Sequence, residues 1–137
     1  MANRISRVEY YSAPVADKPG EAARILTTLE EAGVNLLGFS GFPEGRRAQV
    51  DFIPSDGAAF VKAAKKAGLA IGKKKTVFLI EAEDRVGAVA TIARKLAGAG
   101  INIRSMQAIC AGESRYGGLL WVKPEAVRKA AKVLEAQ

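Results

Sequence analysis

The chain of 137 residues contains no histidine and only one cysteine, Cys110. Without histidine it cannot form Ser-His or Cys-His catalytic pairs, and it lacks the commonest protein ligand of transition metals. One cysteine excludes an intramolecular disulfide and a metal site built from several thiolates. Cys110 lies in the apolar stretch 106–110, so we expect a small core residue and not a reactive nucleophile. The sequence therefore predicts no metal site, no cofactor and no catalytic residues.

The chain also lacks long apolar runs. No stretch reaches the roughly 18 apolar residues that a membrane-spanning helix requires, and residues 1–7 lack the apolar core of a secretion signal. We therefore expect a cytoplasmic protein without a membrane partner. The net charge of +7 could attract nucleic acid or another anionic partner. Solvated helix faces and turns are the commoner reason for such a charge.

The chain matches itself without a gap when it is shifted by 67 positions. Three pairs of segments carry the match: 17–20 with 84–87, 32–36 with 99–103, and 62–65 with 129–132. A constant shift across turns and helices predicts a duplicated fold unit and argues against a chance match caused by similar composition. We place the first repeat at residues 1–72 and the second at residues 73–137.

Periodicity predicts the same elements in both repeats. A first strand is followed by an amphipathic helix, a hairpin of two strands and a second helix. The expected strands are 4–13, 34–42 and 46–53 in the first repeat, and 76–80, 101–111 and 115–122 in the second. Residues 69–71 are a short closing strand candidate, whereas the closing strand of the second repeat is missing or very short. This βαββαβ order is the ferredoxin-like arrangement, an α+β fold.

Each first helix is preceded by Asp-x-x-Gly. Asp17 and Asp84 have the type and position of helix N-caps, so we expect the helices to begin at or near them. Either carboxylate is also a candidate for contact with a ligand. Gly20 and Gly87 would then lie in the first helical turn, where glycine costs roughly 1 kcal/mol relative to alanine. This cost indicates that another backbone or a ligand comes close to each glycine.

Each first helix is followed by Gly-(Val/Ile)-Asn. Gly33 and Gly100 come just after the last helical residue, where a left-handed C-cap is expected. Asn35 and Asn102 begin the next strand and offer a donor and an acceptor. Each is either a turn residue after the glycine or part of a binding site. Because free amides at a helix start favour an anion such as a carboxylate, helix start and asparagine together suggest a small carboxylate ligand.

These residues resemble those of the ACT domains, small regulatory modules, usually paired, that bind amino acids. The likeness rests on residues 17–20 with 33–36 and on residues 84–87 with 100–103, and it covers nearly the whole chain. The chain looks like the short stand-alone proteins that consist of two ACT domains. The resemblance implies two ferredoxin-like ACT-type repeats, with antiparallel sheets and helices on one face. Val86 departs from it, because the family usually has proline there.

In that family the ligand lies between paired domains, where it contacts the loop before the first helix and the residues after that helix's terminal glycine. The resemblance thus implies these ligand-binding candidates: Asp17, Lys18, Pro19, Gly20, Asn35 and Leu36 in the first repeat, and Asp84, Arg85, Val86, Gly87, Asn102 and Ile103 in the second. Since only the first repeat has the intact Asp-Lys-Pro-Gly, we expect its site to be the occupied one.

The resemblance implies a non-enzymatic regulatory protein that senses a free amino acid or a similar small carboxylate at ACT domain interfaces. A regulatory subunit of a separate enzyme of amino-acid metabolism is compatible with this. The alternative is a basic nucleic-acid-binding ferredoxin-like protein, but strands 46–52 and 116–121 lack the aromatic motif of RNA-binding sheets. Small units with exposed sheet edges, one of them without a closing strand, predict at least a homodimer.

Overall fold

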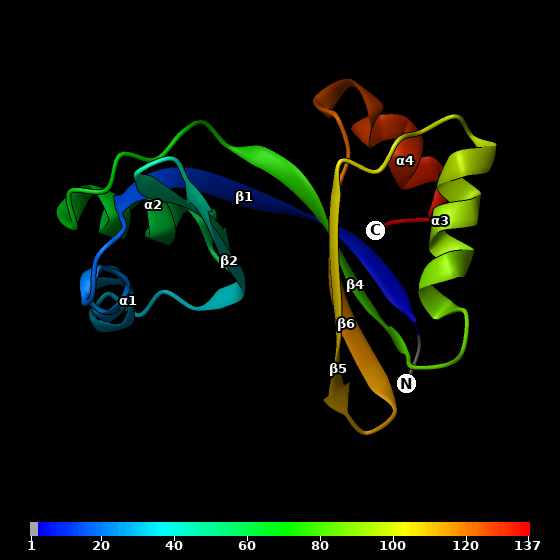
Figure 1. Cartoon of the computed structure of the whole chain (residues 1–137), viewed down its shortest axis with the longest axis horizontal. Coiled ribbons are helices and arrows are strands. Elements are labelled where there is room, and N and C mark those ends of the chain that lie inside the picture. The colour runs from blue at the N-terminus through cyan, green and yellow to red at the C-terminus, as the bar shows by residue number, and fades with distance from the viewer. Residues whose placement is uncertain (1–2) are drawn as a thin grey trace. The chain divides into compact units, whose positions relative to one another are not determined.

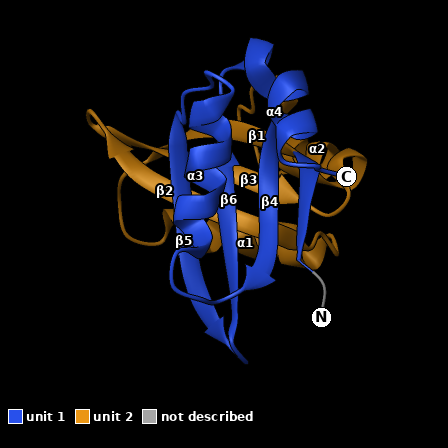
Figure 2. Ribbon diagram, turned by 90° about the vertical axis from the view of Figure 1, so that its right-hand side faces the viewer, with its two compact units in different colours: residues 1–8, 76–137 blue, residues 9–75 orange. Residues whose placement is uncertain are grey.

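The structure is a computed structural model that describes residues 3–137. Contacts divide the chain into two compact units, which are coloured separately in Figure 2. The first-repeat unit consists of residues 9–75, and the second-repeat unit consists of residues 76–137 together with Met1–Val8. The units therefore differ from the expected repeats in the assignment of the N-terminal segment and of residues 73–75. The long first strand, β1, explains the assignment of the N-terminal segment, because it runs from one unit into the other.

The first-repeat unit is an antiparallel sheet with two helices on one face (Figure 1). Its elements are strand β1 (Arg4–Ala16), helix α1 (Glu21–Glu31), strands β2 (Leu36–Glu44) and β3 (Arg47–Pro54), and helix α2 (Gly57–Lys66). The sheet order in this unit is β2-β3-β1. This order of elements agrees with the ferredoxin-like fold that the sequence predicts.

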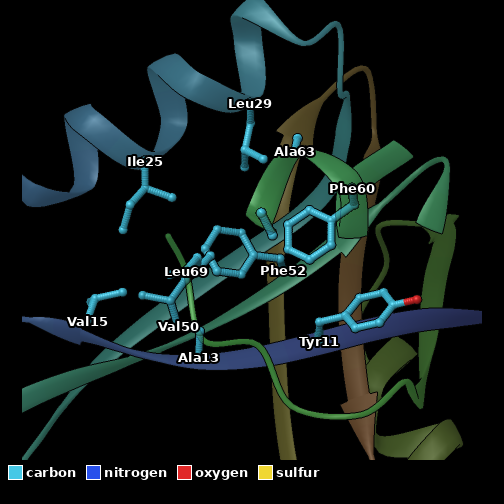
Figure 3. Packing of buried hydrophobic residues seen from close by; sticks show 11 residues of the cluster. Tyr11, Ala13, Val15, Ile25, Leu29, Val50, Phe52, Phe60, Ala63 and Leu69 are labelled. Carbon is cyan, nitrogen blue, oxygen red and sulfur yellow. The ribbon is translucent and has the colours of Figure 1, made fainter. Parts of the chain in front are cut away.

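The core of the first-repeat unit contains the aromatic side chains of Tyr11, Phe52 and Phe60 among aliphatic ones (Figure 3). The ring of Phe52 on β3 lies 5.2 Å from that of Phe60 on α2, centroid to centroid, and 5.5 Å from that of Phe39 on β2. Tyr11 of β1 lies 5.2 Å from Phe60. The rings of Tyr11, Phe52 and Phe60 are buried between sheet and helices, where apolar burial stabilises the unit, whereas Phe39 is 42% exposed.

The second-repeat unit repeats this arrangement with a mainly aliphatic core. Its elements are β4 (Lys75–Glu83), α3 (Ala88–Gly98), β5 (Ser105–Gly112), β6 (Arg115–Trp121), the short helix η1 (Pro124–Ala126) and α4 (Val127–Val133). The sheet order is β1-β4-β6-β5. Ile92 and Leu96 project from α3 onto Phe78, Ile80 and Leu120 of the sheet, as the helical spacing of the apolar residues predicts.

Strand β1 begins in the second-repeat unit. Its residues Arg4–Val8 lie beside β4, where the Arg4 guanidinium donates to both carboxylate oxygens of Glu81 at 2.9 and 3.0 Å. The side-chain oxygen of Asn3 accepts from the backbone N–H of Glu83 at 2.9 Å. The N-terminal segment thus covers the edge of β4 that the sequence left without a partner.

The end of the chain closes the second repeat with a single paired residue. The N–H of Gln137 donates to the carbonyl of Ile5, and the N–H of Arg7 donates to the carbonyl of Gln137, both at 2.9 Å. Strand β1 occupies the sheet edge that we expected to be open after α4. This edge therefore gives no support for a dimer. Residues 69–71, expected as a closing strand, form no strand, although Leu69 is buried in the core of its unit.

The match between the repeats is not free of gaps. Tyr11 of β1 pairs with Phe52 of β3, and Phe78 of β4 pairs with Leu120 of β6. The shift is therefore 67 on the first strand (78 minus 11) but 68 on the return strand (120 minus 52). A register irregularity just before Gly112 in β5 accommodates the extra residue. The buried alanine pairs of α2 and α4 match at 67 again, so the insertion is compensated between them.

Glycines end the first helices as predicted. Gly33 and Gly100 have φ of 73° and 72°, in the left-handed region. The N–H of the next residue, Val34 or Ile101, donates to a carbonyl in the last helical turn at 2.9 Å in each repeat. This is the Schellman motif, in which glycine avoids the strain that a side chain would suffer. The C-cap prediction is confirmed in both repeats.

Candidate functional site

The Asp-x-x-Gly segments form a tight turn before each first helix, not the first turn of the helix. Helices α1 and α3 begin at Glu21 and Ala88, directly after the glycines. Gly20 has φ 86° and ψ −14°, and Gly87 has φ 82° and ψ 6°, which are the angles of the third residue of a type II turn. Because positive φ cannot continue into a right-handed helix, each helix starts after its glycine.

Neither Asp17 nor Asp84 caps a helix, so the expected N-cap role is wrong. Each lies four residues before the first helical residue, which places its side chain beyond the amides of the first turn. Asp56 shows the contrast, because its carboxylate accepts from the N–H of Ala59 at 3.1 Å at the start of α2. The carboxylates of Asp17 and Asp84 are thus available for other contacts.

Conformation accounts for Gly20 and Gly87, and close packing does not. A Cβ atom added at either position would meet no atom within 4 Å in the described part of the chain. The described part of the chain therefore brings no other backbone close to either glycine. Positive φ alone requires glycine here, and in the first repeat Pro19 adds the residue that a type II turn prefers at its second position.

A pocket of about 320 Å³ opens in the second-repeat unit, between the start of α3 and the β5–β6 hairpin. Its volume lies near the lower end of the roughly 300–1,000 Å³ range of small-molecule sites. The residues that line it are Asp84, Arg85, Gly87, Ala88, Val89, Ala90, Ala108, Ile109, Cys110 and Tyr116. The pocket thus combines the predicted loop with strand residues that the sequence did not indicate.

Strand pairing and small side chains form this hollow. The N–H of Asp84 donates to the carbonyl of Ser114 at 2.8 Å, which ties the loop to the hairpin turn. Cys110 pairs with Tyr116, so the alternation of strands places Cys110 and Ala108 on the sheet face that carries Tyr116. Because two of these three residues are small, space remains between the sheet and the start of α3.

The charged side chains of the loop reach the strands that line the pocket. A hydrogen bond to the carboxylate of Asp84 raises the pKa of the Cys110 thiol above its usual value. Burial raises the pKa of the Tyr116 hydroxyl, and the positive charge of Arg85 partly opposes this effect. The thiol and the phenol are therefore neutral at physiological pH. Asp84 and Arg85 give the pocket one negative and one positive group.

Backbone amides at the start of α3 add a second place for an anion. The first N–H groups of a helix have no partner within the helix. In α3 the N–H of Ala88 closes the preceding turn by donating to the carbonyl of Arg85 at 3.1 Å. The next amides, those of Val89 and Ala90, belong to residues that line the pocket. Together with the helix dipole they favour a carboxylate at this end of the pocket.

The predicted site residues fall into two groups at opposite ends of the first helices. Residues 84–87 precede α3, and Asn102 follows it. Eleven helical residues with a rise of 1.5 Å each separate the two ends by roughly 16 Å. The same holds for residues 17–20 and Asn35 around α1. A single amino acid therefore cannot contact the loop and the asparagine of one unit, as the sequence-based hypothesis required.

The other ligand-binding candidates pack against a core, form backbone hydrogen bonds or lie exposed outside the pocket. Leu36 and Ile103 are half-buried and pack against the cores of their units. The backbone carbonyl of Asn35 accepts from the N–H and hydroxyl of Ser55 at 3.0 and 3.2 Å. Val86 is fully exposed and does not line the pocket. Of the six candidates in the second repeat, the pocket therefore brings together Asp84, Arg85 and Gly87. Val86, Asn102 and Ile103 do not line it.

Sequence reasoning missed the strand side of the pocket. Cys110, expected as a core residue, is exposed because β5 is the edge strand of its sheet. For its neighbours Ala108 and Ile109 the sequence predicts only a place in an apolar strand. The available signal was the alternation of small residues at 108, 110 and 112 on a strand that follows a first helix.

The corresponding loop of the first repeat carries an ion pair of its own. Arg24 donates to the carboxylate of Glu21 at 2.7 Å and to the carbonyl of Ala67 at 3.0 Å. The hydrogen bond from Arg24 lowers the pKa of Glu21. Glu21 occupies the position of Ala88 in the repeat alignment. A carboxylate of the chain thus already lies at the start of α1, where the second repeat leaves room for a ligand.

The ACT domain family matches residues 76–137, which hold the pocket. This segment is an ACT domain. The match covers the turn before α3, the helix and the hairpin, so the resemblance seen in the Asp-x-x-Gly and Gly-Ile-Asn segments is confirmed for the second repeat. The first repeat has the same ferredoxin-like order of elements. No curated protein matches the chain.

Solved structures with low sequence identity share the fold of the whole chain. A protein from Bacteroides thetaiotaomicron has a TM-score of 0.83 at 20% identity, with 96% of this chain and 88% of that chain covered. The regulatory subunit of aspartate kinase from Thermus thermophilus has a TM-score of 0.64 at 17% identity, with 98% and 93% covered. Aspartokinase alpha and beta subunits have a TM-score of 0.63 at 22% identity, with 98% and 95% covered.

Two kinds of site have no counterpart in residues 3–137. No helix in this range is both long and apolar enough to cross a membrane. No cluster of three or more histidine, cysteine, aspartate or glutamate side chains in this range could hold a metal ion.

Proposed function

We propose that this chain is a non-enzymatic regulatory protein that senses a free amino acid in the pocket of its ACT domain. The observation that carries the proposal is the placement of Asp84, Arg85 and the start of α3 around one pocket of about 320 Å³. A free amino acid carries an ammonium group and a carboxylate on one carbon. Asp84 would accept from the ammonium, and Arg85 with the amides of Val89 and Ala90 would donate to the carboxylate.

This proposal changes two parts of the sequence-based hypothesis. The acceptor for the ammonium group is an aspartate of the loop and not Asn102, which lies at the far end of α3. The favoured repeat is the second and not the first, because the ion pair between Glu21 and Arg24 occupies the start of α1. A ligand carboxylate near α1 would have to displace the Glu21 carboxylate.

We propose a separate enzyme of amino-acid metabolism, in the cytoplasm, as the regulated partner. The support is the fold shared with the regulatory subunit of aspartate kinase from Thermus thermophilus. The absence of histidine, and of any assembled nucleophile and base in the sequence, also favours a regulatory role. Affinity capture with the tagged chain, with and without the bound amino acid, should recover the same enzyme in a ligand-dependent amount.

We also propose association into a homodimer, on different grounds from those in the sequence. Strand β5 is an edge strand without proline or charged residues, and nearly all of its residues are exposed. Such an edge offers unpaired backbone groups to another strand. Sedimentation at micromolar concentration should show a mass above that of the monomer, and a monomer with and without ligand would contradict this part of the proposal.

Thermal-shift screening against the twenty amino acids tests the function. An amino acid that binds only the native state raises the melting temperature, and at a hundred times its Kd it stabilises by about 2.7 kcal/mol. We expect such a shift for one amino acid or a few similar ones, followed by a measurable Kd in calorimetric titration. If no amino acid shifts the melting temperature or releases heat, the sensing function is wrong.

A further inference from the structure

We infer that the pocket beside α3 selects an amino acid with a small, uncharged aliphatic side chain, such as valine or leucine. This inference rests on the proposed function and deepens it by naming the ligand class. Three observations carry it: the charged groups of the lining, the apolar character of the remaining wall, and the size of the hollow.

The charged groups of the pocket match the backbone groups of an amino acid and leave nothing for a charged side chain. Among the lining residues only Asp84 and Arg85 carry charge. Cys110 and Tyr116 are neutral, since Asp84 raises the pKa of the thiol and burial raises that of the phenol. A charged ligand side chain would lose water without gaining a partner of opposite charge, which costs free energy.

The remaining wall is apolar. Val89 lies at the start of α3 and Ala108 on β5, with the ring of Tyr116 on β6. Val89, a large apolar side chain that is 39% exposed, also lines the pocket. An aliphatic side chain that entered the hollow would cover apolar surface that now faces water, which favours binding.

The size of the hollow limits the ligand. A volume of about 320 Å³ is small for a ligand site. It exists because Ala88, Ala90 and Ala108 have the smallest side chain that the lining offers apart from glycine. These three alanines leave room for a branched aliphatic side chain beside α-groups that bind at Asp84 and Arg85.

Calorimetric titration of the wild-type chain with a panel of amino acids tests the selectivity. The panel contains glycine, alanine, valine, leucine, phenylalanine, aspartate and lysine. We expect valine or leucine to bind at least about tenfold more tightly than glycine, because each added carbon in an apolar pocket raises affinity. Aspartate and lysine should bind more weakly than alanine.

A filled pocket provides the second arm of the test. Ala108→Leu should weaken the binding of leucine at least about tenfold and that of alanine less, because it removes space for the side chain and leaves Asp84 and Arg85 in place. Gly41→Leu is the matched control, since Gly41 holds the same position on β2 of the first repeat, and it should leave leucine binding unchanged. If Ala108→Leu melts at a lower temperature than the wild type, the same titrations are made with the smaller substitution Ala108→Val.

The possible outcomes separate the inference from the proposed function. Tightest binding by a charged or aromatic amino acid that Asp84→Asn abolishes would overturn the inference and leave the sensing function standing. Absence of binding by every amino acid would overturn both. Preference for valine or leucine that Ala108→Leu shifts toward alanine supports both.

Discussion

In both repeats a glycine with positive φ, Gly20 or Gly87, ends a tight turn, and a helix begins at the next residue. That next residue is Glu21 in the first repeat, where it pairs with Arg24, and Ala88 in the second repeat, where it lines the pocket. The backbones agree and the chemistry differs. The comparison shows that Asp-x-x-Gly forms the turn that precedes the helix in both repeats. The side chains around this turn determine whether a pocket is present.

The cores differ in a similar way while the fold is kept. Phe52 and Phe60 in the first-repeat unit correspond to Leu120 and Val127 in the second. At these two positions aromatic rings fill the space in one unit, and smaller aliphatic side chains fill it in the other. A ferredoxin-like sheet with two helices thus tolerates either filling, provided that the total volume suits the gap between the layers.

The largest expected effects come from emptying the two cores. Phe52→Ala should lower the free energy of unfolding by about 3–5 kcal/mol, and Leu120→Ala by about 2–5 kcal/mol, because both side chains are fully buried and leave cavities. Urea denaturation followed by circular dichroism measures both. A loss below about 1 kcal/mol for either variant would show that its core is not packed as described.

Alanine at the turn glycines should have an intermediate and equal effect. Gly20→Ala and Gly87→Ala should each lower the free energy of unfolding by about 1–2 kcal/mol, because a side chain is strained at positive φ and no neighbouring atom adds a clash. The same denaturation measurement applies. Unequal losses would mean that the two turns do not share one cause for their glycine.

Exchange of Glu21 and Ala88 tests the chemical difference directly. Ala88→Glu should weaken amino-acid binding at least about tenfold, because a carboxylate fixed at the start of α3 competes with that of the ligand. Glu21→Ala should leave this binding unchanged. Titration calorimetry measures both variants, and unchanged binding by Ala88→Glu would contradict the proposed position of the ligand carboxylate.

The residue with positive φ that follows the second helix is a glycine in the first repeat and a glutamate in the second. Gly68 follows α2 with φ 71°, whereas Glu135 holds the same position after α4 with φ 54°. Glu135→Gly should raise the free energy of unfolding by about 0.5 kcal/mol, as relief of left-handed strain slightly exceeds the entropy cost of glycine. Thermal denaturation should show a higher melting temperature than for the wild type, and a lower one would contradict this explanation.

The smallest expected effect is a dependence on pH. Arg24 lowers the pKa of Glu21 below its usual 4.5 in the folded chain. Glu21 therefore contributes stability above pH 4.5, and this contribution is lost as the pH falls through the lowered pKa. Arg24 is exposed to solvent, so the contribution is small. The melting temperature of the wild type should exceed that of Glu21→Ala at neutral pH, and the difference should vanish in acid.

The repeats, the order of elements and the glycines at 33 and 100 could be predicted because each rests on local periodicity or on a backbone angle. The helix starts were predicted incorrectly. Asp17 suggested an N-cap, although Pro19-Gly20 is the pair that a type II turn prefers at its two central positions. Turn chemistry therefore outweighed capping preference in both repeats.

The strand side of the pocket could not be read from periodicity. Alternation shows which residues of β5 share a face, but not that β5 lies at the edge or that Cys110 comes near Asp84. Contacts between segments distant in sequence depend on the register of β5 with β6, where one extra residue changed the alignment of the repeats. A gap-free shift conceals such an insertion.

Binding by matched aspartate variants tests the central claim most directly. Asp84→Asn and Asp17→Asn remove the same charge from the same position of the two turns, and neither residue is a helix cap. With the amino acid identified in the thermal screen, calorimetric titration should show binding at least about tenfold weaker for Asp84→Asn, because the ammonium group loses its charged acceptor. Asp17→Asn should bind like the wild type. Unchanged binding by Asp84→Asn, or lost binding by Asp17→Asn, would contradict a ligand site in the second repeat.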